Sequence, residues 1–223
     1  QTGISWKHKE DKFTDFNTQY LIPHQQSTRG PGMATADVNK DGLEDLFVCG
    51  AKGQPGVLLL QSANEKFILG DTAIFSKNKN SEGVACTFFD ADNDGDMDLY
   101  VASGGNEYPD GDPALADHLY INDGKGNFSE WESSLPELYY NKSTVSAADI
   151  DKDGDIDLFI GVLADAKKYG YPKTSYLLIN DGNGNFITAS ERIINLKDVG
   201  IVTTSSFSDL NKDGWLDLIV TGE

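Results

Sequence analysis

A nine-residue acidic segment that recurs four times constrains this chain more than any other feature. The richest copy is residues 90–98, Asp-Ala-Asp-Asn-Asp-Gly-Asp-Met-Asp, and the apolar run Leu99–Val101 follows it directly. Carboxylates packed this densely repel one another unless a cation lies between them. Their alternate spacing directs oxygens inward from one loop, and Gly95 permits the sharp bend. The segment therefore predicts a hard-cation site, with calcium as the best candidate.

The other copies follow the same rule of an acidic loop before an apolar run. The four copies begin at residues 37, 90, 149 and 209, which gives spacings of 53, 59 and 60 residues. A fixed period of this size indicates a repeat architecture.

Each repeat can be divided into four short strands. A first strand rich in small residues leads into the acidic loop, and a wholly apolar second strand follows it. An Asn-Asp-Gly turn at 122–124, and again at 180–182, predicts the hairpin between strands three and four. Four short strands per repeat are typical of a β-propeller blade. Uniformly apolar second strands favour a sheet covered on both faces, because a solvated sheet would alternate. The expected fold class is all-β, a β-propeller of four-stranded blades.

The ends of the chain suggest how the ring closes. We expect one domain over 1–223, with repeats at about 31–69, 84–131, 144–190 and 203–223. The last repeat stops after its second strand, whereas residues 4–16 resemble an unpartnered third and fourth strand. Joined by strand exchange, the two pieces would complete a fourth blade and remove the free edge. The alternative is that the chain is part of a larger propeller.

Charge and composition exclude several classes of protein. The net charge of −18 argues against nucleic acid and against an anionic membrane surface as partners. No apolar run reaches transmembrane length, so membrane insertion is not expected. The two cysteines, Cys49 and Cys86, lie in or beside strand-like runs; free buried thiols are favoured, with a disulfide as the alternative.

The loops, the apolar strands after them and the Asn-Asp-Gly-x-Gly-Asn-Phe hairpins together resemble FG-GAP/VCBS-type repeats. Such repeats occur in integrin alpha-subunit heads, in cartilage-acidic-protein-like molecules and in large exported bacterial proteins. The resemblance covers nearly the whole chain and is nearest to the bacterial VCBS-like branch, since no clean Phe-Gly…Gly-Ala-Pro signature is present. It implies about four Ca²⁺ ions, one per loop, and an extracellular, periplasmic or cell-surface location.

The resemblance also implies which atoms bind the metal. Side chains at loop positions one, three, five and nine and the carbonyl at position seven would be ligands. An EF-hand is excluded because position twelve, where it needs a Glu, holds Val or Ile in every copy. The implied ligands are Asp37, Asn39, Asp41, Leu43 and Asp45; Asp90, Asp92, Asp94, Asp96 and Asp98; Asp149, Asp151, Asp153, Asp155 and Asp157; and Asp209, Asn211, Asp213, Trp215 and Asp217.

We expect a non-catalytic binding or adhesion module in which calcium staples each blade. A protein or glycan ligand would bind the face opposite the acidic loops, carrying residues 24–29, 52–54, 104–111 and 167–171. No nucleophile, metalloprotease or phosphate-loop motif is present, and three histidines fall at unrelated repeat positions. The alternative is a carbohydrate-active propeller, either a lectin or a calcium-dependent polysaccharide lyase. A lyase would need a base such as Lys167, Lys168 or Arg29.

Overall fold

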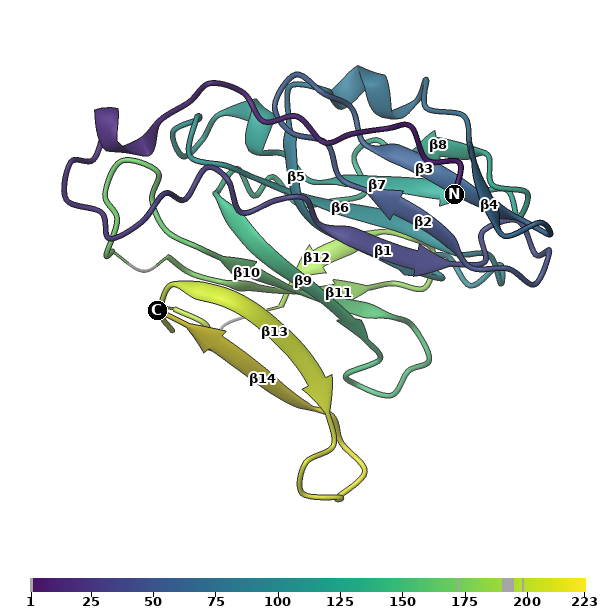
Figure 1. The fold of residues 1–223 in the computed structure, drawn as a ribbon. Coiled ribbons are helices and arrows are strands. Elements are labelled where there is room, and N and C mark those ends of the chain that lie inside the picture. Colours follow the sequence, from purple (N-terminus) through teal and green to yellow (C-terminus); the bar gives the residue numbers. More distant parts are fainter. Residues whose placement is uncertain (1, 172, 190–194, 198) are drawn as a thin grey trace.

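The computed structural model describes residues 2–171, 173–189, 195–197 and 199–223, and these residues form an all-β protein. Four antiparallel sheets follow one another in chain order (Figure 1). Three sheets have four strands each, and the fourth has two strands within the described residues. The described residues also form three short 3₁₀ turns: η1 (Asp15–Asn17) before the first strand, η2 (Phe75–Asn78) between the first two sheets and η3 (Pro113–Leu115) within the second repeat.

Every sheet is built from strands that are consecutive in the chain, so each repeat forms its own sheet. The acidic loops join the first and second strands, and the hairpins join the third and fourth. The strands are β1 (Met33–Ala36), β2 (Asp45–Val48), β3 (Val57–Ser62) and β4 (Lys66–Leu69); β5 (Glu82–Phe89), β6 (Asp98–Gly104), β7 (His118–Asn122) and β8 (Phe128–Glu130); β9 (Lys142–Ala148), β10 (Asp157–Val162), β11 (Tyr176–Asn180) and β12 (Phe186–Thr188); and β13 (Val202–Ser208) and β14 (Asp217–Gly222).

The second strands of the first three sheets are buried on both faces, as their composition predicts, whereas β14 of the fourth sheet is only partly buried. Every residue of β6 is buried. Leu99 and Val101 pack in the core between the first and second sheets, whereas Tyr100 and Ala102 pack in the core between the second and third. Because side chains alternate along a strand, one continuous apolar run supplies two interfaces. The core is therefore a series of layers between successive sheets.

The first strands of successive sheets pack side by side. β1 packs against β5, β5 against β9, and β9 against β13. Small side chains permit this close approach and also bond across it. Ser205 on β13 lies 2.7 Å from the Ser146 hydroxyl and 3.2 Å from the Thr144 hydroxyl, both on β9. The small residues expected near a crowded axis therefore do lie between neighbouring sheets.

The prediction that residues 4–16 form two strands is wrong. They contain no strand, and 15–16 belong to η1. The chain from Thr2 runs along the first sheet to η1 at the other end of the molecule (Figure 1), and Thr2 O accepts from Phe67 N of β4 at 2.8 Å. Trp6 packs beside Val57 of β3. The physical reason is that Trp6 finds an apolar surface on the first sheet, and Asp15 is fixed by hydrogen bonds from Ser27 and Asn106.

Both cysteines are free thiols in the structure, as the sequence favoured. They belong to the same core layer, and a hydrogen bond with Cys86, together with burial, raises the pKa of Cys49 well above its usual value. Among the described residues, no helix is long and apolar enough to cross a membrane.

Candidate metal-binding loops

We name the acidic segments loop 1 (37–45), loop 2 (90–98), loop 3 (149–157) and loop 4 (209–217). All four have the same backbone shape. The glycine at position six has a positive φ in each, for example +84° at Gly95 and +87° at Gly214. Position four is also left-handed, as at Lys40 and Asn93. Two left-handed residues two apart produce the tight bend that turns the acidic side chains toward one another.

The first carboxylate of each loop holds the bend closed. In loop 2, the Gly95 amide donates to Asp90 Oδ2 at 3.0 Å, and in loop 4 the Gly214 amide donates to Asp209 Oδ2 at 2.9 Å. The position-nine carboxylate accepts from the position-two amide in every loop, at 2.8–3.2 Å. The nine residues thus contain the hydrogen bonds that shape their own loop.

Carboxylate oxygens converge most closely in loops 2 and 3. Ligand atoms of Asp90, Asp92 and Asp98 lie within 4.8 Å of one another, and so do those of Asp149, Asp151 and Asp153. The Oδ1 atom of Asp90 is buried and has no hydrogen-bond partner among the described residues. A buried anionic oxygen without a partner is costly, and a cation would remove that cost.

Loops 1 and 4 carry an asparagine at position three, so they offer one carboxylate fewer. In both loops, the side-chain oxygens of positions one and three still accept from the same backbone amide. In loop 1, the Asp41 amide donates both to Asp37 Oδ1 at 3.1 Å and to Asn39 Oδ1 at 3.0 Å. In loop 4, the corresponding Asp213 amide donates to Asp209 Oδ1 and Asn211 Oδ1.

Within the loops, Asp98 and Asp157 at position nine have the most strongly raised pKa values. Burial, followed by the charges of Asp92 and Asp94, raises the pKa of Asp98 to about 7 against the hydrogen bonds it accepts. Burial and the neighbouring acids raise the pKa of Asp157 to about 6 in the same way. A group of acids that resists full ionisation is one that a divalent cation would stabilise.

The same carboxylates have a second role that the sequence analysis missed. Asp98 Oδ2 accepts from Ala91 N and its Oδ1 accepts from Asn122 N on β7, both at 2.8 Å. Asp45 and Asp157 bond to Gln61 N and Asn180 N of their own third strands in the same way. Position nine therefore connects the loop to the third strand of the sheet. The signal was its fixed place directly before each second strand.

Successive loops also contact one another in a regular order. Position four of each loop reaches position seven of the next. Lys40 pairs with Asp96, and Asn93 Nδ2 donates to Asp155 Oδ1 at 2.7 Å. Lys152 Nζ lies 3.9 Å from the centroid of the Trp215 ring. All four loops therefore lie at one end of the sheets.

The hairpin asparagines were predicted only as turn residues, but they join neighbouring repeats. Asn122 Nδ2 donates to Val38 O of loop 1 at 2.7 Å, and Asn180 Nδ2 donates to Ala91 O of loop 2 at 2.9 Å. Both asparagines are buried. Sequence alone could not show this, because the partner lies more than 80 residues away.

Within the described residues, the structure brings together ligand atoms of positions one, three and nine in loop 2 and of positions one, three and five in loop 3. That all four side chains of each loop bind one ion stays a prediction. The position-seven residues are Leu43, Asp96, Asp155 and Trp215. Trp215 is exposed and Asp96 is buried. That their carbonyls bind metal stays a prediction. The site offers only carboxylate, amide and carbonyl oxygens, and this donor set fits Ca²⁺ better than a soft metal.

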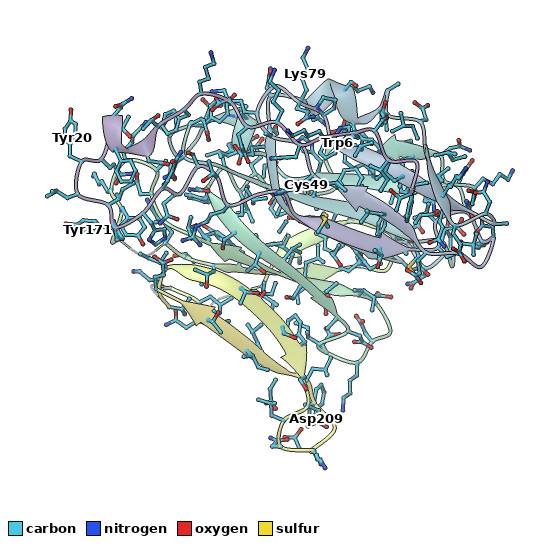
Figure 2. All side chains as sticks on the ribbon, in the orientation of Figure 1. Trp6, Tyr20, Cys49, Lys79, Tyr171 and Asp209 are labelled. Atoms are coloured by element: carbon cyan, nitrogen blue, oxygen red, sulfur yellow. The ribbon has the colours of Figure 1, made fainter. Side chains whose placement is uncertain are left out.

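The expected variable segments gather at the opposite end of the sheets. Lys52 Nζ lies 4.3 Å from the centroid of the Tyr108 ring, and Gln19 bonds to Ala166 O and Tyr169 N. Figure 2 shows Tyr20 and Tyr171 at this end and Asp209 at the tip of loop 4, far from them. The acidic loops and the variable segments are thus segregated.

These observations define a class of protein: an all-β repeat protein in which each repeat is a small sheet carrying one acidic loop. The profile of the FG-GAP-like repeat family matches residues 37–101 and 90–160, which together span more than half of the chain. The chain belongs to this family. A search of curated proteins found no matching relative.

Proposed function

We propose that the protein is a calcium-stapled propeller module that binds a protein or glycan and has no catalytic activity. The observation that carries the calcium part is the convergence of Asp90, Asp92 and Asp98, with Asp90 Oδ1 buried and without a partner in the described structure.

Calcium would be held by the acids of each loop and would neutralise their mutual repulsion. Each loop lies between the first and second strands, and its position-nine acid also reaches the third strand in loops 1–3. An ion bound only by the folded state stabilises that state by mass action. For extracellular calcium modules, a Kd on the order of 10⁻⁴–10⁻³ M is usual. The ion therefore has a structural role in this proposal.

The test is thermal unfolding of the protein in chelator and in millimolar Ca²⁺. We expect the chelator to lower the Tm and Ca²⁺ to restore it. Replacing Asp90 and Asp92 together by Asn should reduce the Ca²⁺-dependent rise, whereas Glu132→Gln, a change to an exposed acid outside the loops, should not. An equal Tm in chelator and in Ca²⁺ would contradict the proposal.

The variable end supports the binding role. Tyr20, Leu21 and Tyr171 are 81%, 97% and 68% exposed, and the bonds of Gln19 to Ala166 O and Tyr169 N bring their two segments together. Exposed aromatic rings bind sugar faces or protein side chains. A glycan array in the presence and absence of Ca²⁺, repeated with the Tyr20→Ala and Tyr171→Ala variants, distinguishes a lectin from a protein-binding module. Loss of glycan signal in both variants would favour the lectin.

The lyase alternative has weaker support. Arg29 Nη2 is 2.7 Å from Glu223 Oε1, and Arg29 Nε also bonds to Gln26. Arg29 is thus already engaged by an acid, while Lys167 and Lys168 remain as candidate bases. Release of unsaturated uronate from pectin-like polymers would establish lyase activity and overturn the non-catalytic proposal.

Family membership and the segregation of loops from variable segments also support export and a ring of blades. We propose an extracellular, periplasmic or cell-surface location. Within the described residues, β14 pairs with β13 on one side and with no strand on the other. Ring completion would add a third strand at this free edge. Solution scattering tests this: a compact disc supports the ring, and an elongated shape contradicts it.

A further inference from the structure

Two further acidic residues lie outside the loops, at the end of the second sheet opposite loop 2. Glu82 is the first residue of β5, and Glu107 follows the end of β6. Glu82 is only 3% exposed. Its Oε2 atom and the Oε2 atom of Glu107 are both buried, and neither has a hydrogen-bond partner in the described part of the chain.

The two carboxylates converge on the backbone at Gly105. A Cβ atom at this position would lie 2.8 Å from Glu82 Oε2 and 2.5 Å from Glu107 Oε2. Gly105 has a φ of +92°, so it also needs the conformational freedom of glycine. The backbone therefore leaves room for both acids to approach the same point.

The surroundings add negative charge. Glu10 and Asp11 act on Glu82, and Asp11 and Asp15 act on Glu107. Burial, then the neighbouring acids, raises the pKa of Glu82 to about 9; burial raises that of Glu107 to about 7.

The nearest basic groups are engaged elsewhere. Lys52 acts on Glu107, but its ammonium lies over the Tyr108 ring. Gly105 also lines a cavity of about 200 Å³ beside Lys142, whose ammonium is bound to Asp117 Oδ1 at 3.0 Å. Neither Glu82 nor Glu107 forms an ion pair within the described residues, so the charge of Lys52 acts on Glu107 without a direct salt bridge.

We propose that Glu82 and Glu107 bind one Ca²⁺ ion at the end of the sheets opposite the acidic loops. The two carboxylates, whose Oε2 atoms are buried and without a partner in the described part of the chain, supply hard oxygen ligands. The ion would connect the start of β5 to the segment after β6, and would compensate for the acids that the N-terminal segment brings to this end. The site is independent of the four loops.

The test is native mass spectrometry at neutral pH in the presence of Ca²⁺, which measures the number of ions bound to each variant. The variants are Glu82→Gln and Glu107→Gln, with Glu132→Gln as the exposed control and Asp213→Asn as a change within loop 4. We expect Glu82→Gln and Glu107→Gln each to bind one ion fewer than the unmodified protein and the control. Glu107 is less buried than Glu82, so its variant gives the readout if Glu82→Gln does not fold.

The proposal would be overturned if Glu82→Gln and Glu107→Gln bound as many ions as the unmodified protein and Glu132→Gln, with only Asp213→Asn binding fewer. It would also be overturned by a Glu82→Gln variant whose Tm rises by the same amount with and without Ca²⁺, because the pair would then simply share a proton. If the loops themselves bound no ion, the unmodified protein would carry one Ca²⁺ and Glu82→Gln none. Failure of this site and failure of the loop sites are therefore distinguishable.

Discussion

Loops 2 and 4 have the same motif and share most of their internal hydrogen bonds, yet their environments differ. In loop 2, Asp98 is fully buried and bonds both to its own loop and to β7. In loop 4, Asp217 is half-buried and accepts from Leu210 N at 2.9 Å. Loop 2 lies between two neighbouring loops, whereas loop 4 is contacted through Lys152 of loop 3.

The pKa shifts of two acids at different loop positions, Asp92 and Asp213, have opposite directions. Burial and the charge of Asp94 raise the pKa of Asp92 in loop 2. Hydrogen bonds from Trp215 N and the Asn211 amide lower the pKa of Asp213 in loop 4. The nine-residue motif therefore determines the shape of the loop, and the neighbouring sheets determine how deeply its position-nine acid is buried.

The largest expected effect separates the two position-nine acids. Asp98→Ala leaves two backbone donors without an acceptor in a buried place, which should lower the free energy of unfolding by about 2–5 kcal/mol. Asp217→Ala should cost no more than about 1.5 kcal/mol, because solvent can replace the lost bond. Urea denaturation in chelator measures both, without any contribution from bound ions. Equal losses would contradict the comparison.

The next effect concerns the hydrogen bond from a hairpin asparagine to the preceding loop, which loops 1 and 2 have and loop 4 does not have within the described residues. Asn122→Ala removes the donor to Val38 O and should cost about 1–3 kcal/mol, since that buried carbonyl loses a partner. Asn127→Ala changes an exposed hairpin residue that bonds only to Asp123 nearby, and it serves as the matched control. Urea denaturation of the two variants should rank them in this order. A control as damaging as Asn122→Ala would mean that the hairpin, rather than the contact between repeats, matters.

A third change should affect both loops alike. Gly95→Ala and Gly214→Ala place a Cβ at a φ of +84° and +87° with no close contact. Each should cost about 1 kcal/mol through backbone strain alone. Thermal unfolding of both variants measures this. A much larger loss at Gly95 would show that burial, not local geometry, controls the bend.

The smallest effect concerns β8, the fourth strand of the second sheet, which has no counterpart in the last sheet within the described residues. Glu130 on β8 lies 3.0 Å from His118 Nδ1 and accepts from Asn78 at 2.6 Å. The hydrogen bond with His118 lowers the pKa of Glu130, and the bond from Asn78 adds to this. The ionised form is favoured on folding, so its stabilisation is present above the unfolded pKa and is lost as pH falls through the folded pKa. In Glu130→Gln, the free energy of unfolding should therefore fall less steeply with decreasing pH below about pH 4.5. Urea denaturation at a series of pH values measures this, and an unchanged slope would show that Glu130 does not contribute.

Much of the fold could be predicted because its rules are local. The acidic loops, the apolar second strands and the hairpins fall where periodicity places them, and the family follows from the same residues. The strand prediction for residues 4–16 failed because a strand-like composition does not specify a neighbouring strand with which the segment can pair. Trp6 and Asp15 are held by the first sheet and by Asn106, and these contacts are invisible in sequence.

The sequence by itself determined the loop conformation, because Gly95 and its counterparts and the first carboxylate of each loop act within nine residues. Only the tertiary structure decided that Asp98 would be buried against β7, that Asn122 would reach loop 1, and that Glu82 and Glu107 would meet over Gly105. The physical reason is range. A turn is selected by backbone sterics and short hydrogen bonds, whereas burial and charge crowding depend on which distant sheets pack together.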